Sequence, residues 1–420
     1  MKEKSVFVCS GTFVEDVLIA DGVSVIGGLD CARPEWTPSG NKTRLAPLRS
    51  PVMQANGVVT PTRVEGFEVI APDATEPSTS SIAVFVQDSP GLTIVASKIV
   101  AGNGAKGADG AEPPPVVVGG TINGQAGDVP KDVCSADYWA CEPAGRAAGG
   151  TMTCDGVMNP IMRGGSGGAA GIWESVSTPL GGGWGYRYKD NDPKYAPTNG
   201  EDRAGTHGAR GVNGKSATGY GSFARTGYQP LDGTAGTNGS VGAGGSAGDG
   251  IGHVLPCNFC GQGGKVAFRS WGGAGGGAGG CGGVAGTAGR GGGASIAVFA
   301  YASPIKLVDV AIVTGNGGAG GRGSFGARAT LGGKAGTYTH VATAGQPGGN
   351  GGPAGTSGSG AGGPSIGIAF TGTTPEMVDT TITLGKSGDG VPELRRDDGV
   401  GGVSIIAASG TSPAVETVGF

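Results

Sequence analysis

The sequence predicts an all-β fold, a parallel β-helix whose stacked repeats carry glycine-rich insertions on one side. A short apolar unit occurs four times, each copy breaks off after its last apolar run, and glycine recurs at every third residue between the copies. Such a unit has two or three β-branched runs and cannot bury its apolar side alone, so each copy must stack on the next.

The first full copy occupies residues 81–100 and begins Ser-Ile-Ala-Val-Phe-Val, with a Ser-Pro turn before its later runs. The second copy, residues 295–314, begins Ser-Ile-Ala-Val-Phe-Ala, and the third, residues 365–384, begins Ser-Ile-Gly-Ile-Ala-Phe. A partial fourth copy starts at Ser404 and continues after the turn at Ser412-Pro413. If the copies stack in register, all of the insertions leave the scaffold at one edge and lie side by side.

These repeats divide the chain into scaffold and insertion. The predicted segments are 1–100 for the first part of the scaffold, 101–294 for a glycine-rich insertion with six cysteines, 295–314 for a rung, 315–364 for a second glycine-rich insertion, 365–384 for a rung, 385–402 for a short loop insertion, and 403–420 for the final rung.

Residues 5–100 consist of short β-branched runs separated by turns such as Asn56-Gly57, and no segment keeps a 3.6-residue period. Strands about 20 residues apart without helices favour a parallel β-helix, and a β-sandwich is the alternative. The first run, residues 5–9, is too short for a signal peptide and is typical of a strand that lacks a neighbour. We therefore expect upstream sequence to have been removed.

Two stretches carry a resemblance to a known family. Residues 64–69, followed by 81–86 and 92–95, resemble right-handed parallel β-helix proteins of the pectin-lyase-like type, and residues 6–31 resemble the start of secreted glycine-rich β-helix proteins of bacterial surfaces. The resemblance implies a right-handed β-helix over residues 5–100 and the later copies. It does not select an activity, because this group includes polysaccharide lyases, hydrolases, adhesins and phage tailspikes.

The insertions have a period of their own. Glycine makes up 93 of the 420 residues, and runs of six glycines spaced three apart occupy 233–248 and 277–292. Three residues per turn is the period of the polyproline-II helix, and glycine at every third site lets neighbouring backbones exchange hydrogen bonds. The pattern resembles the polyglycine-II bundles of insect antifreeze proteins and of phage tip adhesins. The alternative is chance clustering in a glycine-rich chain.

Charge and cysteine content limit the partners and the compartment. The formal net charge is −4 without long runs of one sign, which excludes an electrostatic footprint for nucleic acid, and no apolar run is long enough for a membrane span. The eight cysteines are disulfide candidates that predict an extracellular or cell-surface location: Cys9, Cys31, Cys134, Cys141, Cys154, Cys257, Cys260 and Cys281. The 22-residue spacing of Cys9 and Cys31 would allow a bridge between neighbouring rungs.

Several motifs are compatible with catalysis or metal binding, but each has a simpler interpretation. The CxxC at Cys257 and Cys260, with Cys281, is a candidate zinc or redox site, although disulfides are the favoured interpretation. Calcium is a possible ligand, and the candidate oxygen ligands lie in 190–192 and at Asp389, Asp397 and Asp398. A polysaccharide lyase would need carboxylates beside a basic residue, and the nearest match is 395–398. His207, His253 and His340 are expected to be solvated loop residues. We predict no catalytic residue and no resident metal.

One aromatic cluster is the candidate ligand-binding site. It contains Trp173, Trp184, Tyr186 and Tyr188, and aromatic faces beside polar groups suit sugars and protein interfaces. The alternative is that these side chains fill the junction between insertion and scaffold, and Tyr220, Phe223 and Tyr228 are candidates for the same role.

The leading functional hypothesis is a non-enzymatic structural or adhesive protein that presents a rigid glycine-rich platform. The predicted partner is a cell-surface glycan or protein, or copies of the chain itself. The alternatives are a carbohydrate-active enzyme, ice binding by a regular face such as 233–248, and a subunit of an extracellular filament.

Overall fold

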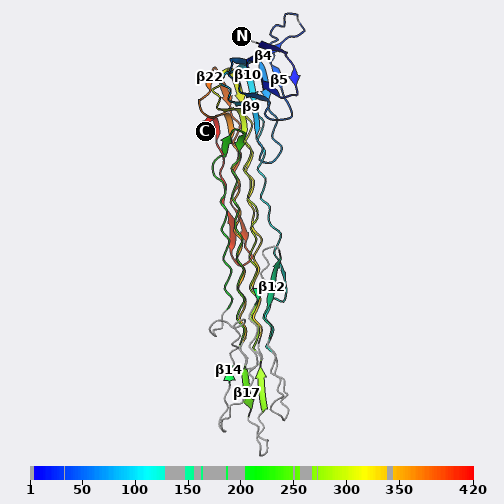
Figure 1. The fold of residues 1–420 in the computed structure, drawn as a ribbon, viewed down its shortest axis with the longest axis vertical. Helices are drawn as coiled ribbons and strands as arrows, with labels where there is room; N and C mark the ends of the chain where they lie inside the picture. Colours follow the sequence, from blue (N-terminus) through cyan, green and yellow to red (C-terminus); the bar gives the residue numbers. More distant parts are fainter. Residues whose placement is uncertain are drawn as a thin grey trace, which may run out of the picture.

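The computed structural model describes residues 4–32, 34–127, 147–155, 162–163, 186–187, 204–248, 251–255, 267–271, 273–337 and 344–420. These residues form β-strands and extended segments and contain no helix. The molecule is long and narrow (Figure 1). Most of the strands gather at one end, which we call the head, and the glycine-rich extended segments run away from it as the shaft.

Two parallel sheets build the head. The ten-stranded sheet contains β1 (Lys4–Cys9), β2 (Thr12–Phe13), β4 (Val23–Leu29), β5 (Thr43–Leu45), β7 (Thr62–Glu65), β8 (Phe67–Ile70), β10 (Leu92–Val100), β20 (Lys306–Val313), β22 (Glu376–Val378) and β23 (Thr381–Thr383). The six-stranded sheet contains β3 (Val17–Ile19), β6 (Met53–Asn56), β9 (Ser81–Gln87), β19 (Ser295–Tyr301), β21 (Ser365–Phe370) and β26 (Ala414–Gly419).

The predicted right-handed β-helix is wrong. The strands instead form a parallel half-barrel and several separate sheets, because the larger sheet branches at β10 and β20 rather than keeping one strand per layer. The first half of β10 pairs with β7 and its second half pairs with β8, and β20 pairs in the same way with β22 and β23.

A backbone bend causes this branching. Gly66, Ala96, Asp309 and Asp379 follow equivalent residues of paired strands, and all four have positive φ, between 44° and 76°. A non-glycine residue rarely adopts this left-handed conformation, which bends the chain away from a straight strand. The head consequently has three columns of six strands, namely β1-β4-β7-β10-β20-β22, β2-β5-β8-β10-β20-β23 and β3-β6-β9-β19-β21-β26.

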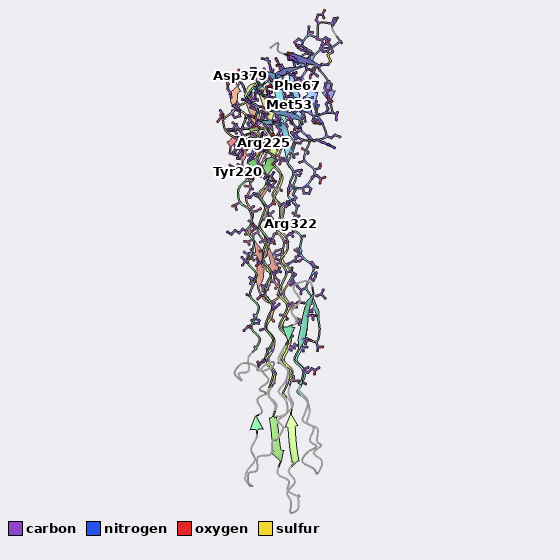
Figure 2. The ribbon with its side chains drawn as sticks, in the orientation of Figure 1. Met53, Phe67, Tyr220, Arg225, Arg322 and Asp379 are labelled. Atoms are coloured by element: carbon purple, nitrogen blue, oxygen red, sulfur yellow. A yellow bond between two sulfur atoms is a disulfide. The ribbon has the colours of Figure 1, made fainter. Side chains whose placement is uncertain are left out.

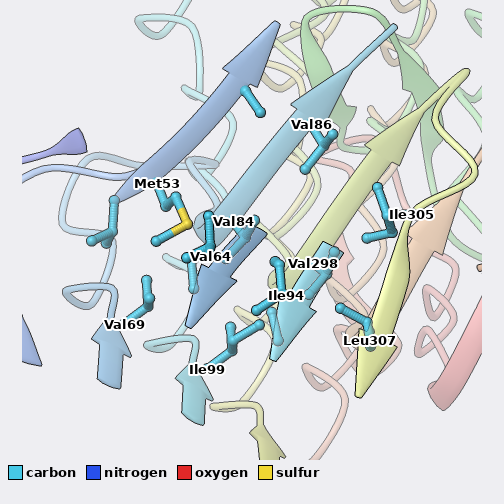
Figure 3. Packing of buried hydrophobic residues seen from close by; sticks show 14 of the residues in the cluster. Met53, Val64, Val69, Val84, Val86, Ile94, Ile99, Val298, Ile305 and Leu307 are labelled. Atoms are coloured by element: carbon cyan, nitrogen blue, oxygen red, sulfur yellow. The ribbon is translucent and has the colours of Figure 1, made fainter. Parts of the chain in front are cut away.

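The core lies between the two sheets, and each column contributes an apolar ladder to it (Figure 3). Val64, Ile94 and Leu307 are paired on successive strands of the first column and are at most 1% exposed. Met53, Val84 and Val298 form the facing ladder in the six-stranded sheet. Alternation along each short β-branched run therefore places one set of side chains inside.

The repeated copies stack in register. Ser81 is paired with Ser295, and Ser295 with Ser365, and the residues that follow are matched in the same way. The last copy differs from the sequence expectation, because β26 pairs with β21 while the segment at Ser404 belongs to β25 (Val403–Ile406) and pairs antiparallel with β24 (Leu394–Asp397) in the shaft.

The remaining strands form small antiparallel sheets outside the half-barrel. These strands are β11 (Val117–Gly119), β12 (Thr151–Asp155), β13 (Met162–Arg163), β14 (Tyr186–Arg187), β15 (Ser222–Ala224), β16 (Gly227–Gln229), β17 (Ile251–Leu255) and β18 (Ala267–Trp271).

Backbone hydrogen bonds arrange the described shaft segments in three layers. The middle layer contains 273–294, 344–364 and 407–413, and it lies between an outer layer of 101–127, 315–337 and 385–393 and a second outer layer of 204–217 and 231–248. Within a layer the bonds recur at every third residue: Gly277, Gly280 and Gly283 donate to the carbonyls of Gln346, Gly349 and Gly352. The polyglycine-II conformation of these segments stays a prediction.

The glycine period follows from the closeness of neighbouring segments, both within a layer and between layers. Within the middle layer, a Cβ added at Gly351 would lie 1.9 Å from the carbonyl oxygen of Cys281. Between layers, a Cβ added at Gly355 would lie 1.9 Å from the carbonyl oxygen of Val212. Real Cβ atoms do not approach backbone so closely. Glycine is therefore required wherever a segment turns its Cα toward a neighbouring segment.

Among the described residues, one disulfide reinforces the head and another reinforces the shaft. Cys9 is bonded to Cys31 in the head, the pair that the sequence spacing suggested, and Cys154 is bonded to Cys281 in the shaft. Cys134, Cys141, Cys257 and Cys260 lie outside the described residues.

The hairpin β15-β16 joins shaft to head. Phe223 stacks between Phe299 of β19 and Phe420, with ring centroids 5.8 and 3.4 Å apart, and Tyr228 is buried beside them. Burial raises the pKa of the Tyr228 hydroxyl to about 12, and this oxygen accepts a hydrogen bond from the backbone N–H of Gly221. Phe223 and Tyr228 thus fill the junction, as predicted. Figure 2 shows Tyr220 and Arg225 at this level.

Candidate interaction surface

The outer face of the 204–217 and 231–248 layer is the most regular surface among the described residues. The two segments are antiparallel, and the backbone N–H groups of Thr234, Thr237, Ser240 and Ala243 donate to the carbonyls of Lys215, Val212, Ala209 and Thr206. All eight of these residues are exposed. We call this surface the small-residue face.

Hydroxyl groups fix the rows of the small-residue face to one another. The Oγ1 atoms of Thr234 and Thr237 and the Oγ of Ser240 each accept a hydrogen bond of 2.7 Å from a backbone N–H of the neighbouring segment. A hydroxyl that accepts one bond can still donate its hydrogen. The face therefore combines fixed side-chain positions with donors that remain available to a partner.

The next residue of each triplet turns toward the middle layer instead. His207 Nδ1 accepts from the backbone N–H of Asn350 at 2.9 Å, Asn213 Oδ1 accepts from that of Thr356 at 3.0 Å, and Ser216 Oγ accepts from that of Ser359 at 3.0 Å. An accepting Nδ1 places the proton of a neutral imidazole on Nε2. His207 is therefore part of the bonding between layers and not a purely solvated residue.

Residues 395–398, the nearest sequence match to a lyase site, lie on the shaft. Asp398 and Arg396 form ion pairs there with Arg210 and Glu112, and we call this group of four residues the clasp. The Asp398 carboxylate accepts bonds from the N–H groups of Val400 and Gly402 and is paired with Arg210. Burial alone would raise the pKa of Asp398, but these donors and the guanidinium together lower it. Arg396 is paired with Glu112 and lies 4.5 Å from the ring centroid of Phe325. The clasp fixes β24 and β25 to the adjacent segments.

Carboxylates on the outside of the ten-stranded sheet also have basic partners. Glu65 is 2.6 Å from Arg63, and Glu68 is 3.0 Å from Lys98. Hydrogen bonding to Glu65 raises the pKa of Arg63. In the described part of the chain, no group of three or more His, Cys, Asp or Glu residues is placed to hold a metal ion.

The opposite face of the shaft carries charge. Asp109 is 2.8 Å from Lys106, and its Oδ1 accepts a 2.8 Å bond from the backbone N–H of Arg322. Burial opposes ionisation of Asp109, but Lys106 and Arg322 lower its pKa overall. Figure 2 shows Arg322 partway along the shaft. The two outer faces therefore differ, because this one carries paired charges whereas the small-residue face has mostly Thr, Ser and Ala side chains with one lysine, Lys215.

Three of the four residues of the predicted ligand-binding cluster lie outside the described residues, namely Trp173, Trp184 and Tyr188. The candidate calcium ligands in 190–192 and His340 also lie outside them. Tyr186 begins β14, which pairs with β17 at the end of the shaft away from the head, and His253 lies in β17. The bond between Cys281 and Cys154 removes Cys281 from the candidate zinc site.

The sequence pattern predicts a regular face over 233–248 only, which is half of the small-residue face. The partner segment 204–217 has the same three-residue glycine spacing at Gly205, Gly208, Gly211 and Gly214, but nothing in the pattern assigns it to that face. Their pairing depends on contacts between residues that are distant in the chain.

No protein-family model, no curated protein and no solved structure matches this chain, so the resemblance to pectin-lyase-like and phage adhesin proteins stays a prediction. Among the described residues, no helix is long and apolar enough to cross a membrane.

Proposed function

We propose that this chain is a non-enzymatic structural or adhesive protein of the cell exterior, in which the head supports a stiff shaft and the shaft presents its surface to a partner. The small-residue face carries this proposal, because its side chains are fixed before any partner arrives. A surface that is already ordered loses little conformational entropy on binding.

Several features support a stiff shaft. The middle layer is almost fully buried between 351 and 364, and its segments bond to neighbours on both sides. Glycine loses more entropy on ordering than other residues, so these bonds and the ties at both ends of each insertion must offset that cost. The Cys154–Cys281 disulfide adds a covalent tie.

The extracellular assignment is part of the proposal. Two disulfides in the described residues support it, because such bonds persist mainly in oxidising compartments. A surface glycan or protein is the proposed partner, and the aromatic residues Trp173, Trp184, Tyr186 and Tyr188 are proposed as further contacts.

A binding screen against glycans and whole cells tests the proposal, using the full chain. Val212 is 71% exposed on the small-residue face, so Val212→Glu changes the surface without disturbing the interior. Leu331, 59% exposed in 315–337, supplies the matched control Leu331→Glu. We expect Val212→Glu to weaken binding at least about tenfold, which is about 1.4 kcal/mol, and Leu331→Glu to bind normally.

The aromatic contacts are tested in the same screen. Loss of binding with Trp184→Ala but not with Val212→Glu would move the contact to the aromatic residues and keep the adhesive function. Absence of any glycan or cell binding by the wild-type chain would reject adhesion.

Ice binding is a second candidate, favoured by one observation. Thr234, Thr237 and Ser240 recur at a strict three-residue interval beside Val212 and Ala209 on one exposed face. Thermal hysteresis of the wild-type chain that is lost in Val212→Glu would support this candidate. Ordinary freezing of the wild-type solution would eliminate it.

A further inference from the structure

Among the described residues, each of the three columns ends, on both sides of the head, in a strand whose outer edge has no paired strand. At one end these strands are β1, β2 and β3, and at the other they are β22, β23 and β26. A parallel strand that lacks a neighbour presents unpaired backbone N–H and C=O groups, which are a template for another strand. The head therefore has two terminal surfaces of the same construction.

The first column shows that the side chains at these surfaces belong to ladders that are buried inside. One ladder runs Val6, Val25, Val64, Ile94, Leu307 and Met377. Its inner members Val64, Ile94 and Leu307 are at most 1% exposed, whereas Val6 is 49% and Met377 is 42% exposed. The ladder thus ends on each side in an apolar side chain, Val6 or Met377, that packs against a ladder member on one side only and is exposed on the other.

The second column ends in the same way. The ladder through Ile99 and Ile312 ends at Phe13 on β2 and at Ile382 on β23. The third column differs, because its buried ladder through Met53 and Val84 begins at Val17 of β3 and ends at Thr417 of β26. Leu18 of β3, which is 71% exposed, and Val418 of β26 belong to the adjacent ladder.

These two surfaces match each other. All strands within a column are parallel, so the end at β22, β23 and β26 of one molecule has the direction needed to pair with β1, β2 and β3 of another. The register inside the head would place Met377 against Val6, Ile382 against Phe13, and Val418 against Leu18. These three pairs would be apolar, and the first two would continue ladders that are buried between the internal layers.

We propose that the head self-associates head to tail, with the β22, β23 and β26 surface of one copy pairing in parallel with the β1, β2 and β3 surface of the next. The occupant is a second copy of this chain, because the contact continues the interface already present between the internal layers. The two surfaces are different, so the contact is heterologous and leaves a free surface at each end of the product. The inference does not depend on the adhesive function.

Two single variants and their mixture test the proposal. Val6→Lys places a charge on one surface and Met377→Lys places it on the other, and both side chains are exposed enough for the monomer to fold. Leu331→Lys, a substitution of an exposed side chain on the shaft, is the control. Mass would be measured by light scattering and sedimentation up to about 0.1 mM, where an interface of micromolar Kd is largely occupied.

We expect the wild type and Leu331→Lys to form species that grow with concentration, and each Lys variant alone to remain monomeric. A one-to-one mixture of Val6→Lys and Met377→Lys should form dimers that do not grow, because one intact surface remains on each chain. A monomeric wild type would overturn the proposal and would leave the free edges to another occupant, such as a further segment of a longer chain. Assembly that is unchanged by both variants, or a mixture that grows beyond dimers, would also overturn it. Thermal unfolding of each variant verifies that the head is folded.

Discussion

The side-chain oxygen Oδ1 of Asn103 lies 2.7 Å from the backbone nitrogen of Asn316 and accepts its hydrogen bond. Asn316 Oδ1 accepts in turn from the backbone N–H of Lys386 at 2.8 Å, and Asp73 accepts from that of Asn103 at 2.6 Å. Asn103, Asn316 and Lys386 each follow the first glycine of a glycine-rich segment that leaves the head. The side chains therefore form a ladder at the boundary between head and shaft.

This ladder predicts that an acceptor at position 316 is needed. Asn316→Ala removes the acceptor for Lys386 and should lower the free energy of unfolding by about 1 kcal/mol, since water can partly replace an exposed bond. Asn316→Asp retains an acceptor oxygen and should cost less. Denaturant unfolding checks the difference, and hydrogen exchange at 385–388 should rise in the Ala variant only. Equal losses in both variants would contradict the ladder.

The closeness of the shaft segments predicts that a single methyl group in the middle of the shaft is strongly destabilising. In Gly351→Ala the new Cβ must displace the backbone of 281–282, and overpacking of this kind costs on the order of 3 kcal/mol. Gly11→Ala is the control, because the nearest atom to its Cβ is 3.9 Å away and its φ is not positive. Guanidinium unfolding should give a large loss for the first variant and almost none for the second.

The aromatic stack predicts that Phe223 fixes the hairpin β15-β16 on the head. Phe223→Ala removes the stacking against Phe299 and Phe420 and should cost about 3 kcal/mol locally. Hydrogen exchange over 222–229 should accelerate, while exchange in β9 changes little. Phe223→Leu retains most of the volume and should show a smaller effect. Unchanged exchange in the hairpin of Phe223→Ala would show that other contacts hold it.

The clasp at Asp398 predicts a dependence of stability on pH. The folded state lowers the pKa of this carboxyl, so its contribution is complete above the unfolded pKa of about 4 and is lost as pH falls through the folded pKa. Asp398→Asn should lower the free energy of unfolding by about 1–2 kcal/mol at pH 7. The difference from wild type should shrink below about pH 4. A constant difference down to pH 2 would show that the carboxylate charge is not the cause.

The repeats and the glycine period could be recognised from sequence because both are local patterns. The register of Ser81, Ser295 and Ser365 follows from similar runs of residues that stack on one another. The sequence pattern wrongly assigns the start of the last copy to Ser404, because a similar run begins there. In the structure, a turn within 397–402 instead pairs that run with β24. Asp398 accepts bonds from Val400 and Gly402, and Gly399 and Gly401 have positive φ, so the turn closes β24 onto β25.

The branching of the large sheet and the layer order of the shaft were not predictable from these patterns. The bend falls at a glycine, an alanine and two aspartates (Gly66, Ala96, Asp309 and Asp379), so no single residue type marks it, and only the stacking of equivalent positions reveals it. The pairing of 204–217 with 231–248 and with 347–359 joins distant segments through backbone groups that every residue has. Because these hydrogen bonds join backbone groups, they do not require particular side chains, and the glycine period is their only signal in the sequence.

The three-residue spacing of the bonds between shaft segments restricts how the length of this protein can change during evolution. An insertion of one or two residues within 344–364 would move every later glycine away from its close contact, and side chains would meet backbone instead. An insertion of three residues keeps the glycines aligned, but the neighbouring segments are then one triplet too short to bond with the added residues. Viable length variants should therefore differ by whole triplets, added to several segments together.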